Sequence, residues 1–177
     1  MTRYLSSLPL ALLVLASTAC VPRAVPPAPV APPPAPVTPA PAPAPTPAAD
    51  WQDWPWTPGA WRYVRDAAGP RASYGVTGQP SVAELRCERG PRAVLLSRPG
   101  SNASPFTIRT SAMTRSVATQ LGAGAVPQVV ARFAIDDRLL DAMAFTRGRF
   151  TVEQPGVTPL VLPPWAEVGR VIEDCRR

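Results

Sequence analysis

The sequence contains no histidine, and all of its basic side chains are arginines, so lysine is absent as well. Without histidine there is no HExxH zinc motif, no Ser-His-Asp triad and no Cys-His dyad, and without lysine there is neither a P-loop nor an SxxK motif. The chain has only three cysteines, so nitrogen and sulfur ligands for zinc are scarce. These absences exclude most familiar hydrolase mechanisms, and we expect neither a metal nor a cofactor.

The chain is moderately basic, with 18 arginines against 12 acidic residues and a formal net charge of +6. Two of the arginines, Arg3 and Arg23, precede residue 50, which leaves 16 arginines against the same 12 acidic residues in the rest of the chain. This surplus is spread along the sequence rather than gathered in a run. We therefore expect no nucleic-acid partner.

The first 19 residues have the composition of an export signal. Arg3 provides a positive charge, and an apolar run interrupted only by two serines and one proline extends from Leu5 to Ala16. A spanning helix needs about 20 apolar residues, so this run suits a cleaved signal peptide better than a permanent membrane helix. Small residues fill positions 17–19, directly before Cys20. Residues 1–19 are therefore predicted to be a signal peptide.

The segment from Ser17 to Cys20 resembles the lipobox of bacterial lipoproteins, although Ser17 stands where that family usually carries leucine. The resemblance implies cleavage before Cys20 and diacylation of its thiol, and two acyl chains anchor a protein stably to a membrane. The next residue is Val21 rather than the aspartate associated with inner-membrane retention. The expected location is the cell envelope, at the outer membrane. The alternative is an ordinary secretory signal cleaved near Ala19.

Proline is concentrated in the segment that follows Cys20. Thirteen of the 26 prolines lie between Pro22 and Pro47, and the rest of that segment is mostly alanine and valine. Such a chain favours extended polyproline II and cannot form a packed core. At about 3.1 Å per residue it could reach on the order of 90 Å. Residues 20–49 are predicted to be a lipidated, disordered tether, and residues 50–177 a single domain.

Residues 50–177 alternate between apolar and polar side chains in short segments separated by Gly- and Pro-rich turns, which indicates strands. Two segments break this pattern: Asp136 can cap a helix that ends before Gly148, and Pro163-Pro164 can begin another that runs to Cys175. The expected fold is mainly β, an antiparallel sheet or sandwich with two short helices, on the borderline of α+β. The predicted strands are 61–66, 72–76, 82–88, 93–97, 106–110, 113–119, 129–135 and 149–153, with a weaker one at 158–162.

Aromatic residues cluster at the start of this domain, with tryptophans at positions 51, 54, 56 and 61 and Tyr63 close behind. Exposed rings of this kind can stack on sugars, whereas buried rings anchor the beginning of a domain. We favour the second interpretation, because a tether has to end where an apolar group docks.

The two remaining cysteines are predicted to form a disulfide that closes the domain. Alternation in the strand at 82–88 places Cys87 on the same face as Ala83 and Leu85. In the last helix, Cys175 shares an apolar face with three residues at helical spacing: Trp165, Val168 and Ile172. Export leads to an oxidising compartment, and lipidation of Cys20 leaves one pair. Two buried free thiols are the alternative; a redox-active pair is disfavoured because there is no CxxC motif.

Three segments of the domain resemble small secreted proteins of the invasion-associated B type. They are the strand cysteine in Leu85-Arg-Cys87, the strand entry Arg147-Gly-Arg-Phe150, and the run Leu160-Val-Leu-Pro-Pro-Trp165 that leads into a helix ending at Cys175. These segments include no catalytic motif. The resemblance implies only a β-rich, disulfide-closed fold.

Five arginines are candidate ligand-binding residues, because each alternates with an apolar neighbour and should face outward from a strand. If their strands adjoin, they form a patch suited to phosphates or carboxylates of an anionic envelope polymer, or to an envelope protein. The alternative is an ordinary solvated sheet face, balanced by Glu84 and Glu153. The five are Arg62, Arg86, Arg109, Arg132 and Arg149.

These observations favour a non-catalytic binding or accessory domain tethered to an envelope membrane. One alternative is an inhibitor of a periplasmic or host hydrolase. Another is a glycan hydrolase that uses carboxylates alone, such as Asp136-Asp137 or Glu173-Asp174. Both acidic pairs lie at predicted helix ends, where capping and solvation explain them better. We therefore expect no enzymatic activity.

Overall fold

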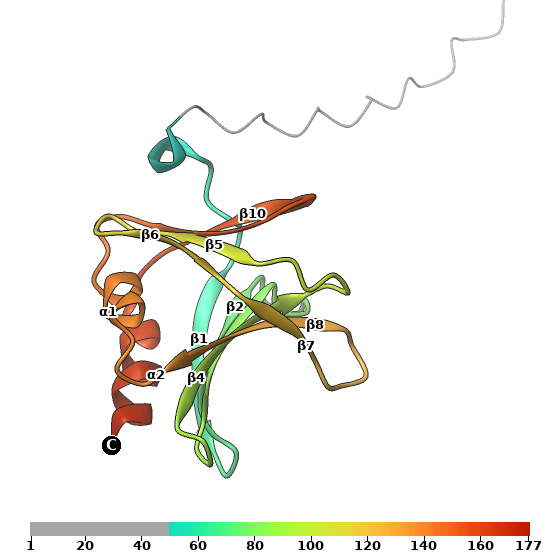
Figure 1. The fold of residues 1–177 in the computed structure, drawn as a ribbon, viewed down its shortest axis with the longest axis vertical. Helices are drawn as coiled ribbons and strands as arrows, with labels where there is room; N and C mark the ends of the chain where they lie inside the picture. The colour runs from blue at the N-terminus through green and yellow to red at the C-terminus, as the bar shows by residue number, and fades with distance from the viewer. Residues whose placement is uncertain (1–49) are drawn as a thin grey trace, which may run out of the picture. The chain divides into compact units, whose positions relative to one another are not determined.

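The computed structural model describes residues 50–177, so the predicted signal peptide, the Cys20 lipidation site and the tether at 20–49 lie outside the described residues. Within the described part no helix is long and apolar enough to cross a membrane. The elements in chain order are a 3-10 turn η1 (Trp51–Asp53), β1 (Ala60–Asp66), β2 (Gly69–Gly75), β3 (Ala83–Glu88), β4 (Ala93–Pro99), β5 (Phe106–Arg109), β6 (Thr114–Val117), β7 (Thr119–Gly122), β8 (Gln128–Ala134), α1 (Arg138–Ala144), β9 (Phe150–Gln154), β10 (Val157–Leu162) and α2 (Ala166–Arg176) (Figure 1).

The strands of the described part form two antiparallel sheets. The six-stranded sheet has the order β1-β2-β3-β4-β8-β7, and the four-stranded sheet has the order β10-β9-β5-β6. Every strand pairs antiparallel with its neighbours. The predicted fold class, mainly β with two short helices, is confirmed.

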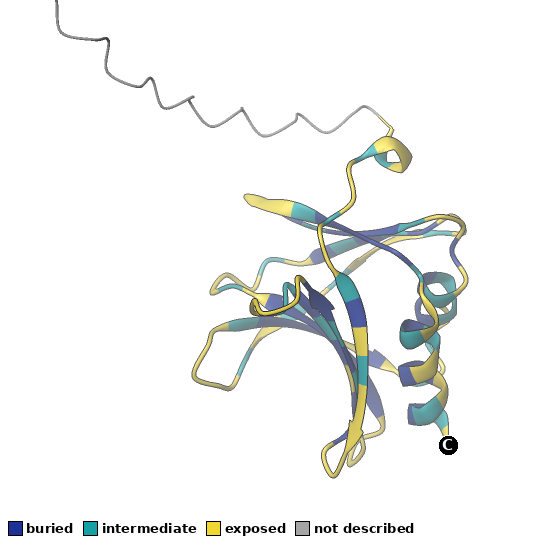
Figure 2. Ribbon diagram, turned by 180° about the vertical axis from the view of Figure 1, so that it is seen from behind, coloured by how far each residue is buried: buried dark blue, intermediate teal, exposed yellow. Residues whose placement is uncertain are grey.

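A single hydrophobic core joins the inner faces of both sheets to the two helices (Figure 2). The core includes three fully buried phenylalanines, Phe106 from β5, Phe133 from β8 and Phe150 from β9. Helix α2 packs against the strands at the β1 end of the larger sheet. Its apolar stripe follows helical spacing, and its buried residues are Val168, Val171, Ile172 and Cys175.

The predicted disulfide is confirmed. Cys87 on β3 and Cys175 on α2 are bonded at an S–S distance of 2.04 Å, across a sequence separation of 88 residues. Both are about 95% buried, with 5% of their surface exposed. Alternation on β3 is as expected, since Ala83 and Leu85 are also buried while Arg86 is exposed. Trp165 does not join the buried stripe, because it lies at the N-cap of α2 with 47% of its surface exposed.

Two details of the predicted elements are wrong. The cap of α1 is Asp137 rather than Asp136, because the Asp137 side chain accepts the hydrogen bond from the Leu139 amide at 2.8 Å. The single strand expected at 113–119 is two strands, β6 in the smaller sheet and β7 in the larger. The chain changes sheets at Ala118. An abrupt change of this kind leaves no mark in the alternation of side chains.

The aromatic cluster divides between core and surface. Trp61 is 4% exposed, its ring centroid is 5.1 Å from that of Tyr74, and its Nε1–H donates to the Pro163 carbonyl at 2.8 Å. Trp56 by contrast is 45% exposed, and Trp51 and Trp54 are only partly buried. The interpretation of this cluster as a core anchor is right for Trp61 and wrong for Trp56.

Candidate functional site

The structure places three of the five candidate arginines on one face of the six-stranded sheet and the other two elsewhere. The outer face of this sheet, opposite the core, carries Arg62, Arg86 and Arg132. Arg62 is paired with Ser73 of β2, which is paired with Glu84 of β3. On the same face, Leu95 of β4 is paired with Arg86 on one side and Arg132 on the other. Arg71, which the alternation of residues 72–76 did not include, lies beside Arg86 in the same row.

Arg109 and Arg149 do not belong to this outer face. Arg109 in β5 is paired with Glu153 of β9, with 2.5 Å between its Nε and the Glu153 Oε1. Arg149 lies at the start of β9, and its guanidinium carbon is 4.1 Å from the centre of the Trp56 ring. The condition for a patch of all five, that their strands adjoin, is therefore not met, because they lie on two different sheets.

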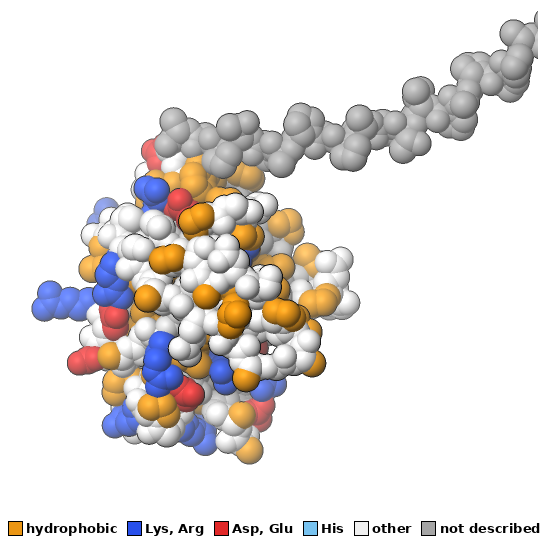
Figure 3. Space-filling model, turned by 45° about the vertical axis from the view of Figure 1, so that its right-hand side comes forward, with side chains coloured by type: hydrophobic (Ala, Val, Ile, Leu, Met, Phe, Trp, Pro, Cys, Tyr) orange, Lys and Arg blue, Asp and Glu red, His pale blue; other side chains and the backbone are white. Residues whose placement is uncertain are grey.

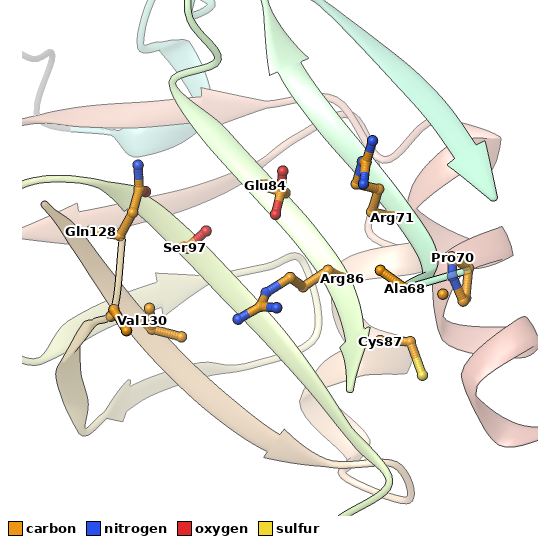
Figure 4. Close-up of a pocket in the computed structure, with 12 residues that line it drawn as sticks. Ala68, Pro70, Arg71, Glu84, Arg86, Cys87, Ser97, Gln128 and Val130 are labelled. Atoms are coloured by element: carbon orange, nitrogen blue, oxygen red, sulfur yellow. The ribbon is translucent and has the colours of Figure 1, made fainter. Parts of the chain in front are cut away.

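A polar pocket of about 270 Å³ lies on the outer face of the larger sheet. Figure 4 shows Glu84 and Arg86 rising from β3, with Ser97 from β4 and Gln128 and Val130 from β8. Arg86 has no carboxylate partner among the described residues, so it is the free cation of this pocket.

Acidic residues offset most of the positive charge on this face. Arg71 is paired with Asp66 at 2.8 Å, and Arg132 is paired with Glu88. With Glu84, three carboxylates stand against the four arginines of the face. Basic and acidic side chains are likewise interleaved on the surface that Figure 3 displays. Exposed ion pairs of this kind typically contribute about 0–1 kcal/mol, and binding of an anionic polymer here stays a prediction.

A second, mainly apolar cleft lies where residues 54–58, the strap, run alongside strand β10. The strap begins after η1 and enters β1 at Gly59. That residue has φ +141° and lies so close to Gly75 that an added Cβ would be 2.7 Å from its backbone. The cleft holds about 380 Å³. We call it the strap cleft. The residues that line it are Trp54, Pro55, Trp56, Thr57, Pro58, Val82, Arg98, Thr158, Pro159, Leu160 and Val161.

Hydrogen bonds and one ring contact hold the strap in place. The Thr57 amide donates to the Val161 carbonyl at 3.1 Å, and the Val161 amide donates to the Thr57 hydroxyl at 2.8 Å. Tyr74 donates its hydroxyl to the Thr57 carbonyl at 2.7 Å. Arg149 stacks on Trp56 and donates to the Trp54 carbonyl. The strap is thus fixed at Thr57, while Trp56 is 45% exposed.

Arg98, near the end of β4, is the charged residue of the strap cleft. It is 7% exposed, and its Nη2 donates to the Thr158 carbonyl of β10 at 3.1 Å. Its Nε and Nη1 are buried and have no hydrogen-bond partner among the described residues. Burial lowers the pKa of this guanidinium. An arginine is rarely buried without a partner, because removing a charge from water is unfavourable.

The sequence contains a signal that would have identified Arg98. Val94 and Leu96 are buried on the inner face of β4, and period-2 alternation continues that face to position 98. A charged residue at the next inward position of a core strand is unusual. The strand predicted for this segment ended at Ser97, one residue too early to include it.

One carboxylate of each acidic pair considered for catalysis has structural contacts in this domain. Asp137 caps α1 and pairs with Arg115 at 2.6 Å, and its pKa is lowered: burial raises it, but the hydrogen bonds from Arg115 and from the Leu139 amide outweigh burial. Asp174 accepts a hydrogen bond from the Tyr63 hydroxyl at 2.5 Å, and this bond is the main cause of its lowered pKa. A general acid for glycoside hydrolysis needs a raised pKa.

Replacement of Asp174 by asparagine should remove a pH-dependent part of the stability. Because folding lowers the Asp174 pKa, the carboxylate stabilises the folded state above the ordinary carboxyl pKa of about 4, and this contribution is lost as the pH falls through the lower, folded-state pKa. Thermal unfolding should therefore give a higher Tm for the wild type at about pH 7 and a much smaller difference at about pH 3. The more exposed Asp66→Asn is the control, and a Tm difference of equal size at both pH values would contradict the expectation.

Among residues 50–177, no group of three or more Cys, Asp or Glu side chains is placed to hold a metal ion. No protein-family model, curated protein or solved structure matches the sequence or the fold.

Proposed function

We propose that this chain is an exported, lipid-anchored protein of the cell envelope whose folded part is a non-catalytic binding domain. The strap cleft is the observation that carries the binding function. It is apolar, lies within the size range of about 300–1,000 Å³ common to ligand sites, and contains one buried cation with free donors. Those features are typical of a site that orients a ligand by one polar group.

The disulfide supports the exported location. Structural disulfides form and persist in oxidising compartments such as the periplasm and the extracellular space, and are rare in the reducing cytosol. The bond between Cys87 and Cys175 joins a core strand to the last helix. A domain closed by this bond is consistent with export, which the pattern of the first residues also indicates.

The contacts of the acidic residues support binding rather than catalysis. Asp137 and Asp174 are ionised more readily than ordinary carboxyls, which opposes a general-acid role. The inhibitor and hydrolase alternatives remain predictions. Turnover of a glycan that is lost on replacement of one of these carboxylates would favour the hydrolase.

Replacement of Cys20 by alanine should release the protein from the membrane. In a Gram-negative host, the wild-type chain should be recovered in the membrane fraction with an intact mass that begins at Cys20 and includes acyl chains, because two chains anchor stably. Cys20→Ala should be soluble and unacylated, while the neighbouring Thr18→Ala should behave as the wild type does. A soluble, unacylated wild-type chain would instead indicate an ordinary secreted protein and would remove the anchor from the proposal.

A further inference from the structure

Several polar groups of the strap cleft are paired within the protein. The Thr57 amide donates to the Val161 carbonyl, the Val161 amide donates to the Thr57 hydroxyl, and the Thr57 carbonyl accepts from the Tyr74 hydroxyl. The Thr158 carbonyl accepts from Nη2 of Arg98. Among the described residues, the buried side-chain nitrogen and oxygen atoms without a hydrogen-bond partner are the Nε and Nη1 of Arg98. A ligand of this cleft therefore needs to supply acceptors at that one place and needs few polar groups elsewhere.

The rest of the cleft is formed by rings and aliphatic side chains. Pro55, Pro58, Val82 and Leu160 line the cleft beside Trp54 and Trp56. A peptide or a sugar placed there would bury amides or hydroxyls that find no partner, and each such group costs about 1–3 kcal/mol. A hydrocarbon chain has no such groups and removes apolar surface from water along its whole length.

The strap is fixed at Thr57, but none of residues 54–58 is fully buried. The 3-10 turn before the strap buries none of its residues, and the exposed Trp56 ring rests against Arg149 rather than in the core. Segments with few buried contacts open at low free energy. The Nε and Nη1 of Arg98 are buried, so a group in the cleft reaches them only when the Arg98 side chain or the adjoining part of the strap shifts.

We propose that the strap cleft binds a free aliphatic carboxylic acid, with the carboxylate on Arg98 and the hydrocarbon chain along the strap and β10. This inference rests on the proposed binding function and names the ligand class of that site. A carboxylate matches the cation in charge and accepts charge-assisted hydrogen bonds, which are about twice as strong as neutral ones. The pairing also removes the two unpaired donors that the free domain buries.

The test compares decanoate with decanol, using calorimetry on the full chain carrying Cys20→Ala so that no acyl chain of the protein competes. Decanoate should bind, and decanol should bind about 30-fold or more weakly, because truncating one partner of a buried charged pair has an effect of that size. Arg98→Met should weaken decanoate binding by a similar factor and leave decanol unchanged. Arg138→Met, which removes an exposed charge at the start of α1, is the matched control and should bind both ligands as the Cys20→Ala parent does.

The outcomes separate the two proposals. Equal affinity for decanoate and decanol, or decanoate binding that Arg98→Met leaves intact, would overturn the role of Arg98 while leaving an apolar binding site. Binding of neither ligand would overturn both the ligand class and the strap cleft as the site of the binding function. The comparison of two ligands on one protein does not depend on the folding of any Arg98 variant, and circular dichroism of Arg98→Met establishes whether the variant is folded.

Discussion

Replacement of both Cys87 and Cys175 by alanine should lower the free energy of unfolding by about 4–5 kcal/mol in the chain-entropy model. The bond closes a loop with a sequence separation of 88 residues, so it restricts the unfolded chain strongly. It also ties β3, in the middle of the larger sheet, to α2, which covers the inner face of that sheet. Native domains are typically stable by about 5–15 kcal/mol in total, so this change removes a large share.

Urea unfolding of the full chain, followed by tryptophan fluorescence, measures this effect. The wild type under reducing conditions should behave as the double alanine variant does, which separates loss of the bond from loss of the sulfur atoms. Cys20→Ala, outside the domain, is the control and should leave the midpoint unchanged. A double variant within about 1 kcal/mol of the wild type would mean that the unfolded chain is already compact or that the bond is not formed.

The strands and the disulfide could be predicted because they depend on local patterns. Alternation over β3 and helical spacing over α2 each place a cysteine on a buried face, and one oxidised pair follows. The cap of α1 was missed by one residue because Asp136 and Asp137 are equally good caps, and only the Leu139 amide distinguishes them. Strand β7 was missed because it has no apolar alternation, and its Leu121 is 56% exposed.

The candidate site was less predictable because it depends on which strands become neighbours. Alternation identified Arg62, Arg86 and Arg132 as outward-facing, but it could not assign Arg109 and Arg149 to a different sheet. The strap cleft requires residues 54–58 to lie against strand β10, which is about a hundred residues later in the chain. No local pattern encodes that contact. Its one local signal is a charge at an inward position of β4.

Replacement of Arg98 by methionine should raise the free energy of unfolding of the ligand-free protein by about 1–3 kcal/mol. Replacing a buried ion pair with apolar residues of similar volume often stabilises proteins by about 1–4 kcal/mol. Arg98 is less well compensated than a pair, because two of its nitrogens are unpaired and it has no carboxylate partner in the described part of the chain. Methionine keeps an unbranched apolar stem in the same space. The expected gain is limited because the Thr158 carbonyl loses the hydrogen bond from Nη2.

Urea unfolding without ligand measures this gain. Arg138→Met should change the free energy of unfolding by less than about 0.5 kcal/mol, because Arg138 is exposed at the start of α1. A loss of stability in Arg98→Met would mean that the arginine is satisfied in the free protein, and the argument for an anionic ligand would lose its basis. A gain in stability together with weaker decanoate binding would mean that Arg98 is kept at the expense of stability. Residues that weaken the fold and strengthen binding are characteristic of functional sites. The two measurements on one variant therefore distinguish a binding residue from a structural one.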